Sequence, residues 1–595
     1  MNRLTVDPMR PVKAIKTLAI LALAAFIVPA FVPTFILPPA RAHVSYNPSP
    51  ADILHAPLSN MGFLAFTEAT GNSSQLTTSP GVSFPSPSAN NKGPDAIRQN
   101  ALRFINDTSY FPQTETSIAV DPTNTDHVVG GFNDQKFFFC RALQSECFLT
   151  GFSVTASGFT VSADGGASVL KGGDIPVLNS SISLVPMFAF GDPTVVSGGN
   201  GVFFYSSLSV SIFGANGVMV ARSNPNLFDP NVSCTTPIFS PTANPCWTAI
   251  LIFGNPDFSV NMEDKPVMVF DQGNDPYSGS LYIGWTHFSF IFGTSVSYLA
   301  RCNSALDSCT MLAGGTLPPL SGNDRFADFT TPAVDAKGNV YVSWCDYGTV
   351  STFGPVTCKV RSSPPGGASF GSTTTILSFM GAGTTLPTDT FTQAFATEQF
   401  RTSSLPYFSV DKSQQSTSGN LYFTIQVCTS GRYVVIHNRG FAQDNPGTCG
   451  LSSILFSSSG DGGSTWSWPA VISQQAVNVQ PTITVDPVTG NLFVLYYTTQ
   501  FDPFNHRIDV VALKSMNGGS SFRQIRVSSA SNEPDSDPNM FNYINGFGGS
   551  WTVPQYGDYF QATSIGGTLW VLFTANYAVE QGTFQTDPFL SVQHA

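Results

Sequence analysis

Charged and amide side chains recur at one position of this sequence, next to a short β-branched stretch. They are Glu115, Asp192, Asp264, Lys265, Arg325, Asp328, Arg401, Gln480 and Asp558. Only 11% of the residues are charged, against about 25% in an ordinary soluble protein, so this recurrence marks a candidate site. The groups could bind or hydrolyse a polar ligand, or they could cap strand ends and bond water. Both interpretations stay open.

Other chemical signals in the sequence are weak. Gly367 to Gly371 matches Gly-x-Ser-x-Gly, but that elbow needs a strand-to-helix turn, which the surrounding turn pattern does not offer. The seven histidines form no His-Glu-x-x-His motif. We expect no required cofactor. Asp271, Asn274 and Asp275 could together hold Ca²⁺, or they could be plain turn residues.

The elements that position the candidate site form a repeat. One phrase recurs: a β-branched stretch, often followed by Asp, then a Gly/Asn turn and an aromatic-aliphatic strand. Its copies are anchored at Val120, Val196, Val269, Val334, Val410, Val485 and Ala562, at intervals of roughly 75 residues. Strand runs alternate with turn clusters and no helical pattern intervenes. The sequence therefore predicts an all-β protein, a β-propeller of four-stranded antiparallel blades, with seven blades favoured over six.

A second motif, Ser-x-Asp-x-Gly-x-x-Trp, lies in the second half of several repeats. It is complete in one copy and carries Asn for Asp in a second, and in a third only the first part, Ser-x-Asp-x-Gly, is kept. The residues are Ser459, Asp461, Gly463 and Trp466, then Ser515, Asn517, Gly519 and Phe522, then Ser162, Asp164 and Gly166. A hairpin turn explains the pattern, because Asp or Asn caps turn N–H groups and Gly accepts a positive φ. We expect these carboxylates to be structural.

These motifs are similar to Asp-box (BNR) repeats, and the chain from about residue 108 to residue 595 resembles the sialidase-like β-propeller superfamily. The resemblance is strong for the fold and weak for activity, because propellers of this kind also bind or scaffold. Sialidases have six blades, so the seventh repeat is a departure. The last repeat lacks a box, and a strand from the segment 43–107, around Leu102 to Ile105, could complete it.

The resemblance implies a sialidase site with three arginines on a substrate carboxylate, a Tyr–Glu pair and an Asp acid/base. The family's Arg-Ile-Pro is missing, and Arg103-Phe104-Ile105 is only a loose echo. Carried over residue by residue, the candidates are Arg103, Arg325, Arg401, Glu115, Asp558 and Tyr559. Two functions follow as hypotheses: a propeller that binds glycan or protein, or a glycoside hydrolase with its site opposite the Asp-boxes.

The N-terminus predicts export. Arg3, Arg10, Lys13 and Lys16 precede an apolar run that ends at Ala40-Arg41-Ala42, which is the pattern of a signal peptide over residues 1–42. An uncleaved anchor is the alternative, and only it would bring the protein to a membrane. We expect a secreted or surface protein.

The ten cysteines fall into five neighbouring pairs, as expected for local disulfides in an exported chain. The pairs are Cys140/Cys147, Cys234/Cys246, Cys302/Cys309, Cys345/Cys358 and Cys428/Cys449. They form no Cys-x-x-Cys metal pattern.

The composition narrows the classes of molecule that this protein could bind. With 26 Lys and Arg against 38 Asp and Glu, the chain cannot lay a basic track along a phosphate backbone, so we expect no nucleic acid. The expected partner is a glycan or an extracellular protein, and the expected state is a monomer.

Overall fold

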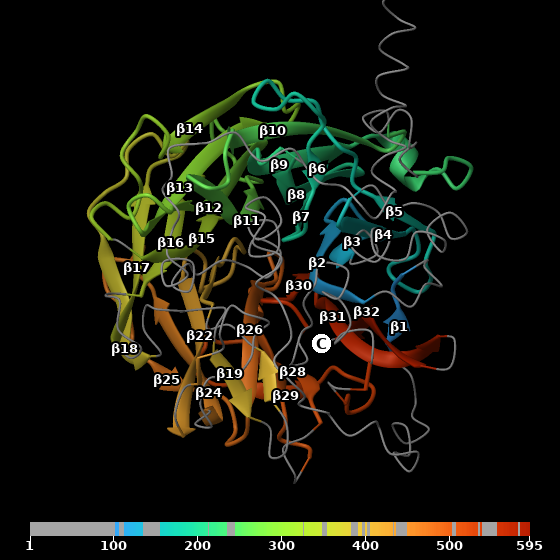
Figure 1. The fold of residues 1–595 in the computed structure, drawn as a ribbon. Helices are drawn as coiled ribbons and strands as arrows, with labels where there is room; N and C mark the ends of the chain where they lie inside the picture. Colours follow the sequence, from blue (N-terminus) through green and yellow to red (C-terminus); the bar gives the residue numbers. More distant parts are fainter. Residues whose placement is uncertain are drawn as a thin grey trace, which may run out of the picture.

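Figure 1 shows the computed structural model, a ring of seven antiparallel sheets whose colours run once around from the blue β1 and β2 to the adjacent red β31 and β32. The predicted all-β, seven-bladed propeller is confirmed. The structure describes residues 101–105, 112–134, 155–211, 213–234, 244–324, 326–347, 354–381, 391–394, 399–401, 405–431, 434–435, 449–502, 507–533, 536–537, 556–580 and 583–594. In this part of the chain the only helix is a short 3-10 turn, η3 (Pro225–Phe228).

Each blade has strands A to D, ordered from the axis outward. Blade 1 contains β2 (Gln113–Asp121), β3 (Asn124–Asp134), β4 (Ser157–Ser162) and β5 (Lys171–Asp174). Blade 2 contains β6 (Phe188–Ala189) and β7 (Thr194–Gly199), which both pair with β8 (Val202–Val210), then β9 (Asn216–Ser223) and β10 (Trp247–Asn255). Blade 3 contains β11 (Asn261–Phe270), β12 (Ser280–Ser289), β13 (Thr294–Asn303) and β14 (Cys309–Ala313).

The remaining blades follow the same order. Blade 4 contains β15 (Ala327–Val334), β16 (Val340–Asp346), β17 (Gly354–Ser363) and β18 (Thr374–Gly381). Blade 5 contains β21 (Tyr407–Val410), β22 (Leu421–Gly431), β24 (Cys449–Ser459) and β25 (Ala470–Val471), with β19 (Phe391–Ala394), β20 (Gln399–Arg401) and β23 (Val434–Val435) attached. Blade 6 contains β26 (Asn478–Val485), β27 (Leu492–Thr498), β28 (Asp509–Ser515) and β29 (Arg523–Arg526). Blade 7 contains β30 (Gln561–Ile565), β31 (Thr568–Glu580), β32 (Thr583–His594) and β1 (Leu102–Arg103).

Blade 7 is built from both ends of the described chain. β1 pairs antiparallel with β32, with Leu102 opposite Leu590, and the Phe104 N–H donates to the Pro588 carbonyl at 2.8 Å. Phe104 is fully buried between blades 7 and 1, among Leu572, Leu590 and residues of β2 and β3. The ring is therefore closed by main-chain hydrogen bonds between the two ends of the described chain.

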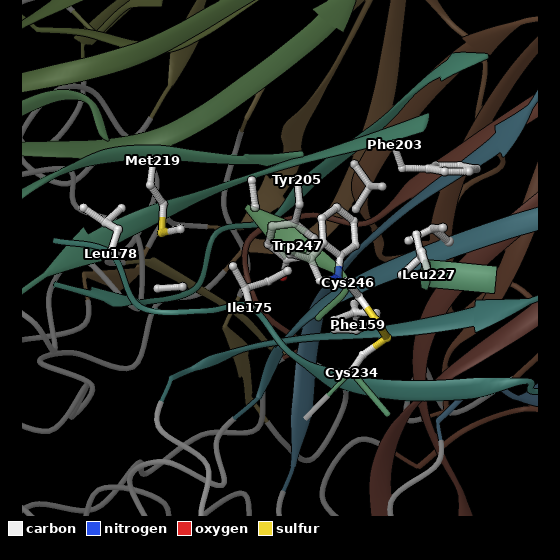
Figure 2. Packing of buried hydrophobic residues seen from close by; sticks show 14 of the residues in the cluster. Phe159, Ile175, Leu178, Phe203, Tyr205, Met219, Leu227, Cys234, Cys246 and Trp247 are labelled. Atoms are coloured by element: carbon white, nitrogen blue, oxygen red, sulfur yellow. A yellow bond between two sulfur atoms is a disulfide. The ribbon is translucent and has the colours of Figure 1, made fainter. Parts of the chain in front are cut away.

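Among the described residues, a hydrophobic cluster lies at each of the seven interfaces between neighbouring blades. Both faces of a second strand are buried, because a blade lies on each side of it. In β12, Leu281 and Ile283 face blade 2, whereas Tyr282 faces blade 4. This burial explains why the second strands read as continuous apolar runs. Figure 2 shows the cluster between blades 1 and 2, where Trp247 and Tyr205 pack beside the Cys234–Cys246 disulfide.

Three of the five expected disulfides are present: Cys234–Cys246, Cys302–Cys309 and Cys345–Cys358. Cys302 and Cys309 are opposite each other on β13 and β14, and Cys345 and Cys358 on β16 and β17. Cys140 and Cys147 lie outside the described residues, as do the side chains of Cys428 and Cys449. Within the described residues, no helix has the length and apolar character needed to cross a bilayer.

The serine–aspartate motifs form one hydrogen-bonded turn between strands C and D. Ser459 Oγ donates to Asp461 Oδ1 and accepts from the Gly463 N–H, and Asp461 accepts from the Thr465 N–H at 2.9 Å. The same bonds recur in blade 1 from Ser162 and Asp164 to Gly166 and in blade 6 from Ser515 and Asn517 to Gly519. The side-chain and main-chain bonds from Thr465 lower the pKa of Asp461 to about 2. Trp466 and Phe522 each pack against an interblade cluster.

Five of the seven first strands end in an aspartate that organises the A–B turn. Asp486 is fully buried and accepts from the Val488 and Thr489 N–H groups of its own turn. It also accepts from the Gly566 and Gly567 N–H groups of blade 7. Burial opposes ionisation of Asp486, but these donors outweigh it and lower its pKa. One carboxylate thus joins two blades.

We expect Asp486→Asn to lower the free energy of unfolding by about 1–3 kcal/mol, because the amide brings a donor against buried N–H groups. Since the folded pKa is depressed, the stabilisation is present above the unfolded pKa and is lost as pH falls through the folded pKa. The loss should therefore be larger at pH 7 than near pH 3, as measured by denaturant unfolding. Asp126→Asn, at an exposed position beside the A–B turn of blade 1, is the control. Equal stability of Asp486→Asn and the wild type at pH 7 would contradict the assignment.

Candidate functional site

Seven of the predicted polar positions lie where a first strand begins: Glu115, Asp192, Asp264, Lys265, Asp328, Gln480 and Asp558. There the chain adopts a positive φ at Glu115 (51°), Asp192 (55°), Lys265 (52°), Phe329 (56°) and Gln480 (50°), and at Gly557 (86°). For β2, β11, β15 and β26 the strand register shifts at this residue, which makes it a β-bulge. A non-glycine residue in this region is strained by about 1–2 kcal/mol, so surrounding contacts must hold it there.

The contacts that hold these residues come from the preceding blade. The Asp192 N–H donates to Asn133 Oδ1 at 2.8 Å, and the Gln480 N–H donates to Gln426 Oε1 at 2.8 Å. The Phe329 N–H donates to Thr286 Oγ1 at 3.1 Å. In each case the acceptor lies near the end of a second strand. The sequence pointed to the first-strand positions but missed these acceptors, whose signal is a polar residue that follows an aromatic-aliphatic run.

Glu115, Asp192 and Asp558 bring carboxyl groups of blades 1, 2 and 7 together near the axis, all essentially buried. Glu115 Oε1 accepts from the Asp558 N–H at 2.9 Å, and Glu115 Oε2 accepts from Asn133 Nδ2 at 2.6 Å. Gly557 has no room for a side chain, because a Cβ there would overlap Glu115. Burial, and next the charge of Asp558, raises the pKa of Glu115 to about 7, so this carboxyl can carry a proton at neutral pH.

Three aromatic rings close the axis beside this carboxyl group. Phe329 of blade 4 lies 5.2 Å from Tyr407 and 6.1 Å from Tyr559 between ring centroids. The Tyr559 hydroxyl donates to the Pro193 carbonyl at 3.1 Å. Burial, and next the charges of Asp192 and Glu115, raises the pKa of Tyr559 well above its usual value. The bond to a carbonyl keeps Tyr559 a neutral phenol.

Below these rings the first strands of all seven blades line an axial cavity of about 270 Å³. Its wall offers polar and apolar surface in similar amounts. It includes six of the seven residues that anchor the sequence repeat, Val120, Val196, Val269, Val410, Val485 and Ala562, and in blade 4 it includes Ala333, the neighbour of the anchor Val334. In Figure 1, β2, β7, β11, β26 and β30 are seen at the middle of the ring.

A second polar group joins blades 3 and 4. Lys265 is fully buried, with its Nζ 3.0 Å from Asp264 Oδ2 and 3.6 Å from Asp328 Oδ2. Asp328 Oδ1 accepts from the Thr286 hydroxyl at 2.8 Å. Burial raises the pKa of Asp328 to about 6, although Lys265 opposes this shift. One ammonium group thus faces two carboxyl groups inside the blade interface.

Glu263 and His287 form a further buried pair in blade 3. His287 Nδ1 lies 2.7 Å from Glu263 Oε1, and Trp285 Nε1 donates to Glu263 Oε2 at 2.5 Å. The His287 ring stacks on Tyr298 at 4.5 Å. Both carboxylate oxygens of Glu263 are thus used in binding side chains of its own blade and of blade 2.

Of the three candidate arginines, only Arg103 has a side chain within the described part of the structure. Arg103 lies on β1, the outermost strand of blade 7, and its Nε donates to Asp587 Oδ2 at 2.6 Å. Arg325 and the side chain of Arg401 lie outside the described residues, so the arginine triad stays a prediction. Of the proposed catalytic residues, Glu115, Asp558 and Tyr559 come together, and Arg103 lies apart from them.

Among the described residues, no group of three or more His, Cys, Asp or Glu side chains is arranged to hold a metal ion. Asp271 and Asp275 do approach each other in the A–B turn of blade 3, whereas Asn274 is exposed.

No protein-family model matches the chain, and no curated protein sequence matches it. Solved structures with a similar fold include the Hadza microbial sialidase Hz136, at 12% identity and a TM-score of 0.36 over 65% of this chain and 63% of that one. A protein of unknown function from Dyadobacter fermentans has 10% identity and a TM-score of 0.39 over 83% and 100% of the two chains. The Penicillium chrysogenum α-L-arabinanase has 12% identity and a TM-score of 0.30 over 54% and 79%.

The chain thus spans less than two thirds of the sialidase that it matches. Its resemblance to sialidase-like β-propellers is one of fold. Activity has to be inferred from the residues of the chain itself.

The raised pKa of Glu115 predicts a pH-dependent stability. Because the folded pKa, about 7, exceeds the ordinary value, the contribution of the protonated group is complete below about pH 4.5 and is lost as pH rises through 7. Glu115→Gln removes this titration. The melting temperature of Glu115→Gln minus that of the wild type should therefore be larger at pH 8 than at pH 5. Asp461→Asn should show no such trend, and a pH-independent difference for Glu115→Gln would contradict the prediction.

Proposed function

We propose that this chain is an exported, glycan-binding β-propeller. Its binding surface is the D–A face, defined as the side that carries the D–A connections and the B–C turns. The observation that carries the proposal is a pair of exposed rings on neighbouring B–C turns of this face: Phe213 of blade 2 is 58% exposed, and Phe292 of blade 3 is 74% exposed. Exposed apolar groups gathered on one side of a soluble domain mark an interaction site.

The two turns are held next to one connection. The Phe258 N–H, in the link between β10 and β11, donates to the Gly214 carbonyl beside Phe213 at 2.8 Å. Two residues further on, the Val260 carbonyl accepts from the Phe290 N–H at 3.0 Å. The rings therefore project from a braced surface. Sugar rings present C–H groups on their faces, and aromatic side chains offer large, rigid contact area to such groups.

The axial carboxyl groups support binding over catalysis. Glu115 is buried, and each of its carboxyl oxygens accepts a hydrogen bond. A ligand on the D–A face would therefore contact the turns and not these buried carboxyl groups. Export is supported by the signal-peptide pattern of residues 1–42 and by three disulfides, which are stable outside the cytosol.

Replacement of the exposed rings tests the binding proposal. A glycan array should identify ligands of the purified protein, and Phe292→Ala should weaken the best of them about 5- to 10-fold, with a larger loss for Phe213→Ala combined with Phe292→Ala. Trp468→Ala is the matched control, since Trp468 is 91% exposed on the opposite, Asp-box face. Absence of any glycan ligand, or an equal loss with Trp468→Ala, would refute the proposal.

Glycoside hydrolysis is the second candidate, favoured by one observation. Glu115, whose pKa is raised to about 7, accepts a hydrogen bond from the main chain of Asp558, and a carboxyl group that can carry a proton at neutral pH beside a second carboxyl group provides the parts of an acid–base pair. We expect any hydrolysis of fluorogenic glycosides, sialosides included, to fall at least 100-fold in Glu115→Gln and in Asp558→Asn and to persist in Asp461→Asn. Activity retained in both axial variants would exclude this centre.

A further inference from the structure

Five first strands end in an aspartate that caps the A–B turn. In four of these aspartates the Oδ2 atom accepts a hydrogen bond. The donors are the Gly201 N–H for Asp121, Asn339 Nδ2 for Asp335, the Thr417 hydroxyl for Asp411 and the Gly567 N–H for Asp486. Asp271 differs. Its Oδ1 accepts from the Gly273 N–H at 2.8 Å, but its Oδ2 is buried without a hydrogen-bond partner in a residue that is 0% exposed.

A second carboxylate lies where Asp271 lacks its donor. Asp275 Oδ1 accepts from the Tyr277 N–H at 2.8 Å, and Asp275 Oδ2 is also buried without a partner. Three oxygen atoms converge around the site where a Cβ on residue 273 would stand. Asp275 Oδ2 would be 2.9 Å from it, Asp271 Oδ1 3.0 Å, and the Ala336 carbonyl oxygen of blade 4 3.3 Å. Gly338 of the same blade 4 turn has no room for a side chain, which would overlap the Asp275 carboxylate.

Blade 5 provides an internal comparison with the same turn. The Asp411 N–H donates to the Asn420 carbonyl, and the Asp411 carbonyl accepts from the Gly419 N–H. Asp271 makes the same two bonds with Ser280 and Gly279. In blade 5, the position of Asp275 is held by Gln415, and Thr417 supplies the hydroxyl for Oδ2. Blade 3 therefore has a second carboxylate in place of a neutral side chain, on an otherwise equivalent backbone.

The neighbouring charges do not neutralise this pair. Lys412 of blade 5 faces Asp271 and Asp335, but its Nζ donates to the Phe270 carbonyl at 3.4 Å. Arg301 lies over the Tyr277 ring at 4.4 Å and donates to the Gly366 carbonyl. One ammonium group thus stands near three carboxylates, those of Asp271, Asp275 and Asp335.

We propose that Asp271, Asp275 and the Ala336 carbonyl bind a Ca²⁺ ion that links the A–B turns of blades 3 and 4. Carboxylate and carbonyl oxygens are the ligands that Ca²⁺ prefers, and its flexible coordination accepts water at the remaining positions. Asn274, which the sequence suggested as a ligand, is exposed, and a carbonyl of the next blade takes its place. The site lies on the Asp-box face, opposite the proposed glycan surface.

The test uses the full protein after treatment with EDTA. Millimolar CaCl₂ should raise the melting temperature of the wild type by about 2–5 °C, because a ligand that binds only the folded state stabilises it. Asp275→Asn should show no shift and should melt at or above the wild type in EDTA, since the variant loses a repulsion. Asp461→Asn, which removes a carboxylate at an exposed turn of the same face, should keep the wild-type shift.

Terbium supplies a direct readout, because Tyr277 borders the site and tyrosine sensitises Tb³⁺ emission. We expect Tb³⁺ luminescence that Ca²⁺ displaces in the wild type and in Asp461→Asn, with at least a tenfold weaker affinity in Asp275→Asn. No Ca²⁺-dependent shift in the wild type, or an equal shift and equal Tb³⁺ emission in Asp275→Asn, would overturn the proposal. The latter result would place the ion elsewhere.

Discussion

A hydrogen bond from the first strand of one blade to the second strand of the preceding blade is the interaction on which this ring depends. At Asp192, Phe329 and Gln480 the donor belongs to a residue with positive φ, which is a costly conformation for a residue with a side chain. At Phe329 and Gln480 the bond secures a β-bulge where the first strand begins. Without it, the seven interblade clusters would lose their common register, because apolar packing alone has no direction.

This construction decides what the axial polar groups can do. Their main-chain and side-chain atoms hold blades together, so groups such as Glu115 and Lys265 are buried. Burial in turn changes their chemistry. It raises the pKa of Glu115 to about 7 and leaves Tyr559 a neutral phenol bonded to a carbonyl. The same residues that join the blades thus include titratable groups with shifted pKa values, while the exposed contact groups lie on the turns around them.

Sequence reasoning found the axial positions but could not assign partners to them. Glu115 and Asp558 are 443 residues apart, and only ring closure makes them neighbours. Asn133, Thr286 and Gln426 were missed because a polar residue at a strand end is ordinary by itself. Arg103 is the opposite case, because the sequence drew attention to it and the structure places it apart from the axial carboxyl groups. Its resemblance to an arginine motif was visible in the sequence, whereas its pairing with Asp587 on the outermost strand of blade 7 follows from the strand order.

The sequence by itself determined the all-β class, the repeat number and the three cysteine pairs that the structure shows as disulfides. These are local properties: strand alternation, turn residues and short cysteine separations are imposed by neighbours along the chain. Only the tertiary structure decided which carboxyl groups meet, which tyrosine remains neutral and which turn lacks a donor for its aspartate. Those outcomes depend on distances between blades and on removal of water, and both arise only when the ring has closed.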